Sequence, residues 1–234
     1  HGFVTHVDLK AIGAAVEARA GEAEVVLLAS VGLHVAFGQR IASVNGCEKE
    51  AAKNIGAAVS RAIRLERQRD ILIDPSYGIE QLETIAWTSI STSKSNPAPG
   101  LLTIFSLRDV LARWSAEAKP DAPEKIFPVV CLDDTPRRLL DAFESLAVVS
   151  SESMQHQNYI AVLETFTALF DRLPNDQQNQ VEDRILRILS ALGDHVLTTQ
   201  LEAALTALAG KLRESKRWAT ADAVQTAQEK LAQS

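Results

Sequence analysis

The side chains that offer the widest choice of chemistry lie between residues 70 and 96. Two carboxylates, Asp70 and Asp74, precede Tyr77, and amide and hydroxyl groups follow. Paired carboxylates can hold a divalent cation or exchange protons with a substrate. Ligand binding by this region is therefore one hypothesis, and its candidate residues are Asp70, Asp74, Tyr77, Gln81, Ser93 and Asn96.

The same acidic residues also have a structural explanation. Asp74 followed by Pro75 is a typical cap and first-turn pair of a helix, and Glu80 and Glu83 follow in that helix. Carboxylates near a helix start interact favourably with the positive end of the helix dipole. Helix capping and ligand binding are both open for this cluster, and no histidine, lysine or glycine-rich phosphate loop accompanies it.

The other candidate groups for chemistry are isolated. His6 and Asp8 could join His34 in a metal site, but strand and cap positions explain them without a metal. Cys47 lacks a basic neighbour in sequence that would activate it as a nucleophile. No nucleotide-binding loop, nucleophile elbow, zinc-protease motif or EF-hand spacing occurs. We therefore assign no catalytic residue, no metal ligand and no cofactor, and we favour a protein that is not an enzyme.

Net charge and cysteine content bear on the binding partners and the cellular compartment of the protein. The formal net charge is −6 and the basic residues are spread along the chain, which argues against nucleic acid as a partner. The densest basic stretch, Arg61 to Arg69, could meet lipid head groups, but the interleaved Glu66 and Asp70 favour a solvated, salt-bridged face. Two cysteines without metal-ligand or CxxC spacing favour a reducing compartment.

The first 47 residues predict a small β-rich module. Residues 2–7 are β-prone, Asp8 can cap a helix, residues 25–29 form an apolar strand, and Gly32 and Gly38 mark tight turns. The expected order is β-α-β-β. The turn-rich half of this module resembles the hammerhead modules that carry biotinyl or lipoyl groups, but no lysine lies at a hairpin tip.

From residue 48 to 234 the apolar residues follow the helical period. One helix opens at Asp74-Pro75 with a buried face that includes Ile85, and a polar loop is expected at residues 89–100. A proline-rich linker near 119–128 and a strand at 129–132 follow. Further helices are capped by Asp134, by Ser151 or Ser153, and near Asp176.

These patterns predict an α+β fold that is predominantly α, with the small N-terminal β-α-β-β module followed by a helical bundle. A chain of 234 residues with 46% apolar content can bury roughly 70 to 75% of its unfolded surface, which suffices for a stable core. The longest apolar runs, at 25–29 and 127–132, have strand length and are too short to span a bilayer. The sequence is also compatible with a bundle in which the helices form an array of helical hairpins.

Two stretches resemble a known family. The opening GFVTHVD with the pattern of residues 32–44, and RQRD at 67–70 followed by YGIEQLETIA at 77–86, are similar to a bacterial family of predicted integral membrane proteins, domain-of-unknown-function family twenty-two fifty-four. Together they cover about the first hundred residues. Where the family shows Ser-Pro-Gly and then Asn-Asp-Pro, this chain has Ser91-Thr92-Ser93 and then Ser95-Asn96-Pro97. If the loop has a function in the family that requires the Asp of Asn-Asp-Pro, that function is altered in this chain.

The resemblance implies transmembrane helices upstream of His1, with this chain as a soluble domain on the cytoplasmic side and those segments as its partner. It implies no known activity. We expect a regulatory or interaction domain whose natural start lies upstream. The alternatives are a ligand-binding or enzymatic domain that uses residues 70–96, and a helical assembly scaffold that forms homo-oligomers.

Overall fold

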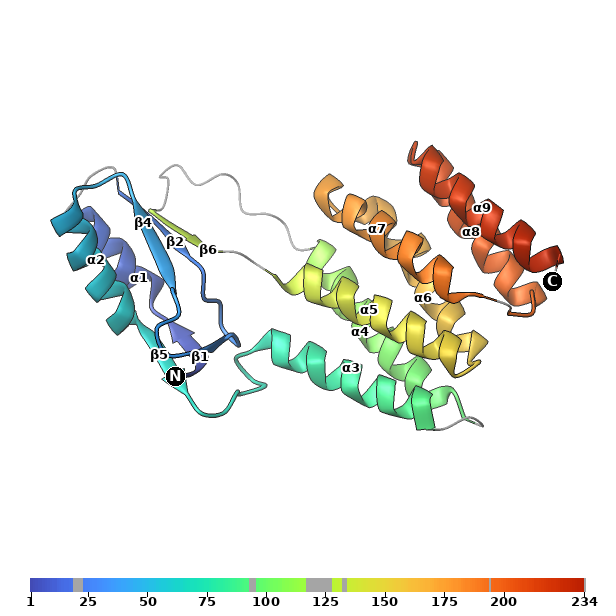
Figure 1. Ribbon diagram of the computed structural model, residues 1–234, viewed down its shortest axis with the longest axis horizontal. Helices are drawn as coiled ribbons and strands as arrows, with labels where there is room; N and C mark the ends of the chain where they lie inside the picture. Colours follow the sequence, from blue (N-terminus) through green and yellow to red (C-terminus); the bar gives the residue numbers. More distant parts are fainter. Residues whose placement is uncertain (19–22, 93–95, 117–127, 132–133, 194, 234) are drawn as a thin grey trace. The chain divides into compact units, whose positions relative to one another are not determined.

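The structure is a computed structural model that describes residues 1–18, 23–92, 96–116, 128–131, 134–193 and 195–233. The chain forms two compact units. Unit 1 comprises residues 1–78 and 118–134, and unit 2 comprises residues 79–117 and 135–234. The described residues form mainly helices, with two small sheets in unit 1, which confirms the predicted fold class (Figure 1).

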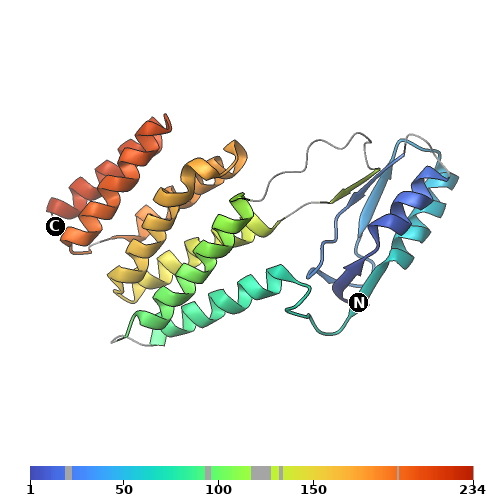
Figure 2. The ribbon, with the colours of Figure 1, turned by 180° about the vertical axis from the view of Figure 1, so that it is seen from behind.

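The described residues of unit 1 form two three-stranded sheets and the helices α1 and α2. Sheet A has the order β3-β1-β5 and is antiparallel, whereas sheet B has the order β4-β2-β6, with β2 antiparallel to β4 and parallel to β6. The helices α1 and α2 pack against each other (Figure 2). The elements are β1 (Gly2–Val7), α1 (Leu9–Glu17), β2 (Glu24–Leu27), β3 (His34–Val35), β4 (Ala42–Asn45), α2 (Lys49–Ala62), β5 (Ile63–Glu66) and β6 (Val129–Cys131).

Local signals explain most of these elements. Asp8 caps α1 as predicted, because its Oδ1 accepts the Ala11 N–H at 2.9 Å. Ile12 and Val16 on α1 and Ile55 on α2 are fully buried, at the spacing that the helical period predicts. These side chains form the core of unit 1 together with apolar residues of both sheets.

Unit 2 is built from helices in two layers. In one layer α6 packs between α4 and α8, and in the other α7 packs between α5 and α9. Figures 1 and 2 show the two layers from opposite sides. The helices are α3 (Pro75–Thr92, whose first turn belongs to unit 1), α4 (Ala98–Ala116), α5 (Thr135–Glu152), α6 (His156–Leu169), the 3-10 turn η1 (Phe170–Arg172), α7 (Asn175–Ala191), α8 (Thr199–Glu214) and α9 (Trp218–Gln233).

The core of unit 2 lies between these layers. Phe143 of α5 meets Phe166 of α6 edge to face, with ring centroids 5.9 Å apart. Tyr159 is buried in the same core, and its hydroxyl donates to the Ile188 carbonyl at 2.8 Å. Burial raises the pKa of Tyr159 because the charged phenolate would lose its hydration. The helices of unit 2 are therefore held by a continuous apolar core, to which the Tyr159 hydroxyl adds a buried hydrogen bond.

Three local predictions are wrong. The polar stretch predicted as a loop at 89–100 is helical up to Thr92 and again from Ala98. Ile90 in this stretch is fully buried, and the hydroxyls of Ser91 and Thr92 bond to the Thr88 carbonyl within the helix. Ser151 lies inside α5, and α6 begins after Gln155, so neither Ser151 nor Ser153 caps a helix start. Ile85 is exposed and does not belong to the buried face of α3.

The predicted boundary between two domains after residue 47 stays a prediction, because it concerns which segments fold independently. In the structure two elements that follow residue 47 pack with the N-terminal ones: α2 packs against α1, and β5 completes sheet A. The predicted strand at 129–132 is confirmed as β6 for its first three residues. Residues 119–127 of the predicted linker lie outside the described residues. Among the residues that the structure describes, no helix combines the length and the apolar character that crossing a membrane requires.

Candidate functional site

Asp74, the central carboxylate of the predicted site, forms a buried ion pair with Arg69. Arg69 Nε donates to Asp74 Oδ2 at 2.6 Å, and Arg69 Nη2 donates to Asp74 Oδ1 at 3.2 Å. The side chains are 9% and 3% exposed. Two parallel charge-assisted bonds fix the direction of both groups. The carboxylate is thus already engaged inside unit 1.

Aromatic rings and a glycine complete the surroundings of this pair. The Arg69 guanidinium lies 4.9 Å from the ring centroid of Tyr77 and 5.9 Å from that of Phe3, within the range of cation–π attraction. Gly32 has a φ of +88°, and a Cβ atom there would lie 2.5 Å from Asp74 Oδ2. Only glycine fits this approach. We call Phe3, Gly32, Arg69, Asp74 and Tyr77 the arginine clamp.

Both predicted aspartates also organise the backbone. Asp74 Oδ1 accepts the Tyr77 N–H at 3.0 Å, so Asp74 caps the start of α3 and the capping interpretation is confirmed. Asp70 Oδ1 accepts the Leu72 N–H at 2.9 Å, and this bond stabilises the turn before α3. The structure therefore brings Asp70, Asp74 and Tyr77 together as parts of one turn and helix start.

The remaining candidates lie in unit 2 or outside the described residues. Gln81 is half-buried near the start of α3, and Asn96 precedes α4, where its Oδ1 accepts the Ala98 N–H at 3.2 Å. The helical rise between Gln81 and Thr92 is about 16 Å. This length of helix separates Gln81 from the connection that contains Asn96. Ser93 lies outside the described residues. A ligand-binding role for the six residues stays a prediction.

A groove runs along α6 and α8 in unit 2. One hollow of about 490 Å³ is lined by Ile160 and by the small side chains Ala203, Ala204 and Ala207, and a second hollow of about 520 Å³ lies at the helix starts. The two hollows share Gln157 and Gln200 as lining residues, so they meet. We call this feature the α6–α8 groove.

The second hollow is bordered by the amino-terminal ends of helices. Pro97 precedes α4, His156 begins α6, and Thr198 caps α8 by accepting the Leu201 N–H at 3.2 Å. Helix starts carry a partial positive charge, and the first backbone N–H groups have no partner within the helix. None of the described residues that line this hollow is acidic. This end of the groove is suited to hydrogen-bond acceptors.

A serine and two histidines of unit 2, Ser151, His156 and His195, lie close together near the second hollow. The Ser151 hydroxyl donates to the Ala191 carbonyl, so His195 Nε2 must donate to Ser151 Oγ, at 2.7 Å. The His195 ring meets the His156 ring edge to face at 4.9 Å. Burial, and next the charge that His156 can carry, lower the pKa of His195. Because the hydroxyl proton points to a carbonyl, Ser151 is not arranged as a nucleophile.

The metal hypothesis for His6, Asp8 and His34 is not supported. Asp8 is used as the α1 cap, and the His34 ring meets the Phe3 ring edge to face at 5.0 Å. In the part of the chain that the structure describes, no three histidine, cysteine or acidic side chains gather in a way that could hold a metal ion.

Sequence reasoning did not identify the groove residues. The small residues of α8 are a weak signal, since Ala203 and Ala207 are exposed alanines one turn apart and leave room beside the helix. Gln157 and Gln200 lie at helix starts, where polar residues are common and suggest no binding role. The groove depends on which helices pack side by side, and no local pattern encodes that.

Comparison with known proteins finds one family. The family model of DUF2254, described as a predicted membrane protein, matches residues 1–160, a stretch that includes unit 1 and the first helices of unit 2. Neither the curated proteins nor the solved structures contain a match to the chain. Because the family match covers more than half of the 234 residues, the chain belongs to the DUF2254 family of predicted membrane proteins.

Proposed function

We propose that this chain is a regulatory or interaction domain of an integral membrane protein, on the cytoplasmic side, and that its α6–α8 groove receives a polypeptide segment of the same protein. The groove is the observation that carries this proposal. Membership of a family of predicted membrane proteins supports the setting. The cysteines Cys47 and Cys131 are both free thiols, which agrees with a reducing compartment.

The lining of the groove suits a peptide. Ala203, Ala204 and Ala207 let a backbone approach α8 closely, and Ile160 adds an apolar surface. Gln157 and Gln200 carry amides, which can both donate to and accept from peptide groups. Each hollow has room for a few side chains, so a helix or an extended segment fits better than a folded domain.

Photo-crosslinking in the full-length protein, in its native membrane, tests this proposal. We would replace Gln200 with p-benzoylphenylalanine, irradiate, and map crosslinked peptides by mass spectrometry. The matched control carries the same group at Asp222, an exposed residue of α9 away from the groove. We expect Gln200 to crosslink to a segment upstream of His1, and Asp222 not to.

Two other results would contradict the proposal in different ways. Crosslinking from Gln200 no greater than from Asp222 would show that the groove is empty in the assembled protein. A Gln200 adduct with the mass of two chains would place a second copy in the groove and support the assembly-scaffold alternative instead.

A further inference from the structure

One end of unit 1 exposes large apolar side chains that no described residue covers. Phe37 is 98% exposed and Leu72 is 88% exposed, and Ile71 and Ile73 beside Leu72 are about half exposed. Single exposed apolar residues are ordinary, but three consecutive aliphatic residues with a phenylalanine at the same end are not. We call these four residues the apolar tip.

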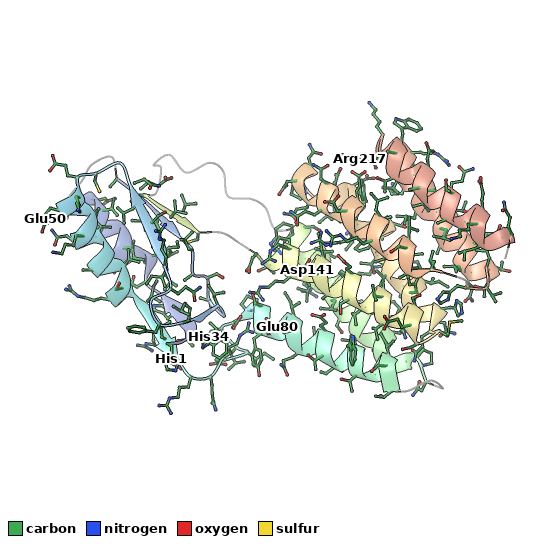
Figure 3. The ribbon with its side chains drawn as sticks, viewed as in Figure 1. His1, His34, Glu50, Glu80, Asp141 and Arg217 are labelled. Carbon is green, nitrogen blue, oxygen red and sulfur yellow. The ribbon has the colours of Figure 1, made fainter. Side chains whose placement is uncertain are left out.

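The register of sheet A places both parts of the tip at one end. Gly2 pairs with Val35 and Phe3 pairs with Glu66, so the connections that follow β3 and β5 both leave the sheet where β1 begins. His1 and His34 lie at this end in Figure 3, whereas Glu50 lies at the opposite end of unit 1. The space around Gly38, next to Phe37, is open.

The part of the tip formed by residues 71–73 lies in a hydrogen-bonded turn. Asp70 accepts the Leu72 N–H through its side chain, and its carbonyl accepts the N–H groups of Ile73 and Asp74 at 3.2 and 3.0 Å. The arginine clamp closes the base of this turn, since Arg69 and Asp74 flank it and are bonded to each other. These bonds give the backbone of residues 70–74 a defined turn, and in this turn the three aliphatic side chains are exposed.

We propose that the apolar tip inserts into the interfacial region of a lipid bilayer. This inference rests on the membrane setting proposed above, but not on the α6–α8 groove. Aliphatic and aromatic side chains on a rigid protrusion, with basic residues beside them, are typical of interfacial membrane anchors. Arg40 and Arg67 are exposed and lie within four residues of the two parts of the tip in sequence. Basic side chains that flank inserted apolar residues typically lie among the lipid head groups.

Apolar contact, rather than charge, carries the binding. Glu66 and Asp70 are exposed beside Arg67 and offset its charge, and the whole chain is acidic. Electrostatic attraction to anionic lipid is screened by salt, whereas burial of apolar surface is not. We therefore expect the chain to bind vesicles at high salt and to bind neutral phosphatidylcholine nearly as well as mixtures with phosphatidylglycerol.

Vesicle co-sedimentation of the whole chain tests this inference. We expect the unsubstituted chain to sediment with phosphatidylcholine vesicles at millimolar lipid. The variants Leu72→Ser and Phe37→Ser should each lower the partition coefficient about tenfold, and the double variant more, because each removes one inserted apolar side chain. The matched control Leu102→Ser changes an exposed leucine of unit 2 and should bind as the unsubstituted chain does.

The outcomes separate the possible explanations. All three residues are exposed, so circular dichroism should show the same fold and melting for every variant. Failure of the unsubstituted chain to bind, or equal binding by the double variant, would overturn the insertion. Binding that disappears at high salt would also overturn it, because charge would then be responsible. None of these results bears on the crosslink from Gln200, so the two proposals can fail separately.

Discussion

The carboxylate of Asp74 makes three contacts in unit 1. It forms an ion pair with Arg69, it caps the start of α3, and it lies against Gly32. A carboxylate in this position looks like a chemical group in the sequence, yet its oxygens are engaged and it is nearly inaccessible. Breaking a buried ion pair costs far more than the pair contributes, because the remaining charge is left without a partner.

The substitution Asp74→Asn should therefore destabilise unit 1 by about 3 to 5 kcal/mol. Amide hydrogen exchange of core residues such as Val25 measures this loss. The control Asp109→Asn removes an exposed partner of Arg113 and should change stability by less than about 1 kcal/mol. Equal, small effects of both substitutions would show that the arginine clamp does not hold unit 1 together.

The lowered pKa of His195 predicts how the stability of unit 2 depends on pH. This pKa is lowered in the folded state, so unfolded chains take up the proton first as the pH falls. The contribution of His195 to stability is fully present above the unfolded pKa of about 6.5 and is lost as the pH falls through the folded value. Urea unfolding followed by tryptophan fluorescence should give lower stability at about pH 5 than at about pH 7.5.

The variant His195→Gln isolates this effect. It removes the titrating group while keeping a side chain that can donate to Ser151, so the loss of stability between the two pH values should become smaller. An unchanged pH dependence would assign the loss to other groups.

Among the elements, α8 forms one wall of the groove and begins with a cap that the structure shows directly. Thr198 Oγ1 accepts the Leu201 N–H, whereas Thr199 is the first helical residue and has no capping role. We expect Thr198→Ala to destabilise unit 2 by about 1 kcal/mol and Thr199→Ala by less than half of that. Thermal unfolding of the two variants side by side measures the difference, and equal shifts would show that the cap contributes nothing.

The helix ends were the least predictable part of the elements. Hydroxyl-rich residues usually mark loops, and the composition of residues 89–100 predicts one. In the structure the hydroxyls of Ser91 and Thr92 both bond to the Thr88 carbonyl, Ile90 is buried, and the helix continues to Thr92. Ser151 shows the same limitation, because its partners Ala191 and His195 come from a distant part of the chain.

In the whole molecule, the chain leaves unit 1 after α2 and β5, builds the first helices of unit 2, and returns to add β6 to sheet B. Val129 pairs with Val25 and is 9% exposed, whereas the adjacent Val130 faces the other side and is 38% exposed. Residues far apart in sequence therefore share one core.

The substitution Val129→Asp should destabilise unit 1 by more than about 3 kcal/mol, since it buries an unpaired charge. The control Val130→Asp should cost less than about 1 kcal/mol. The three tryptophans, Trp87, Trp114 and Trp218, all belong to unit 2 and should report an unchanged unfolding transition there. A parallel loss of both units would show that they unfold as one.

The fold class, the family and the elements with local signals could all be predicted from the amino-acid sequence. The Asp8 cap and the Asp74-Pro75 helix start depend on neighbours within a few residues, and both are present. The apolar run predicted as a strand at 129–132 forms β6 over its first three residues, although its partner strand β2 lies far away in the sequence. The apolar residues that follow the helical period from residue 48 onward include fully buried residues such as Ile55 and Leu205, because this period places apolar side chains on one face of a helix.

The surroundings that give these residues their roles are seen in the tertiary structure alone. It showed that Asp74 is occupied by Arg69, that the turn with Leu72 exposes its aliphatic side chains, and that α6 and α8 leave a groove between them. These features depend on which segments pack together across the chain. Packing selects complementary surfaces rather than local patterns, so no short stretch of sequence contains that information.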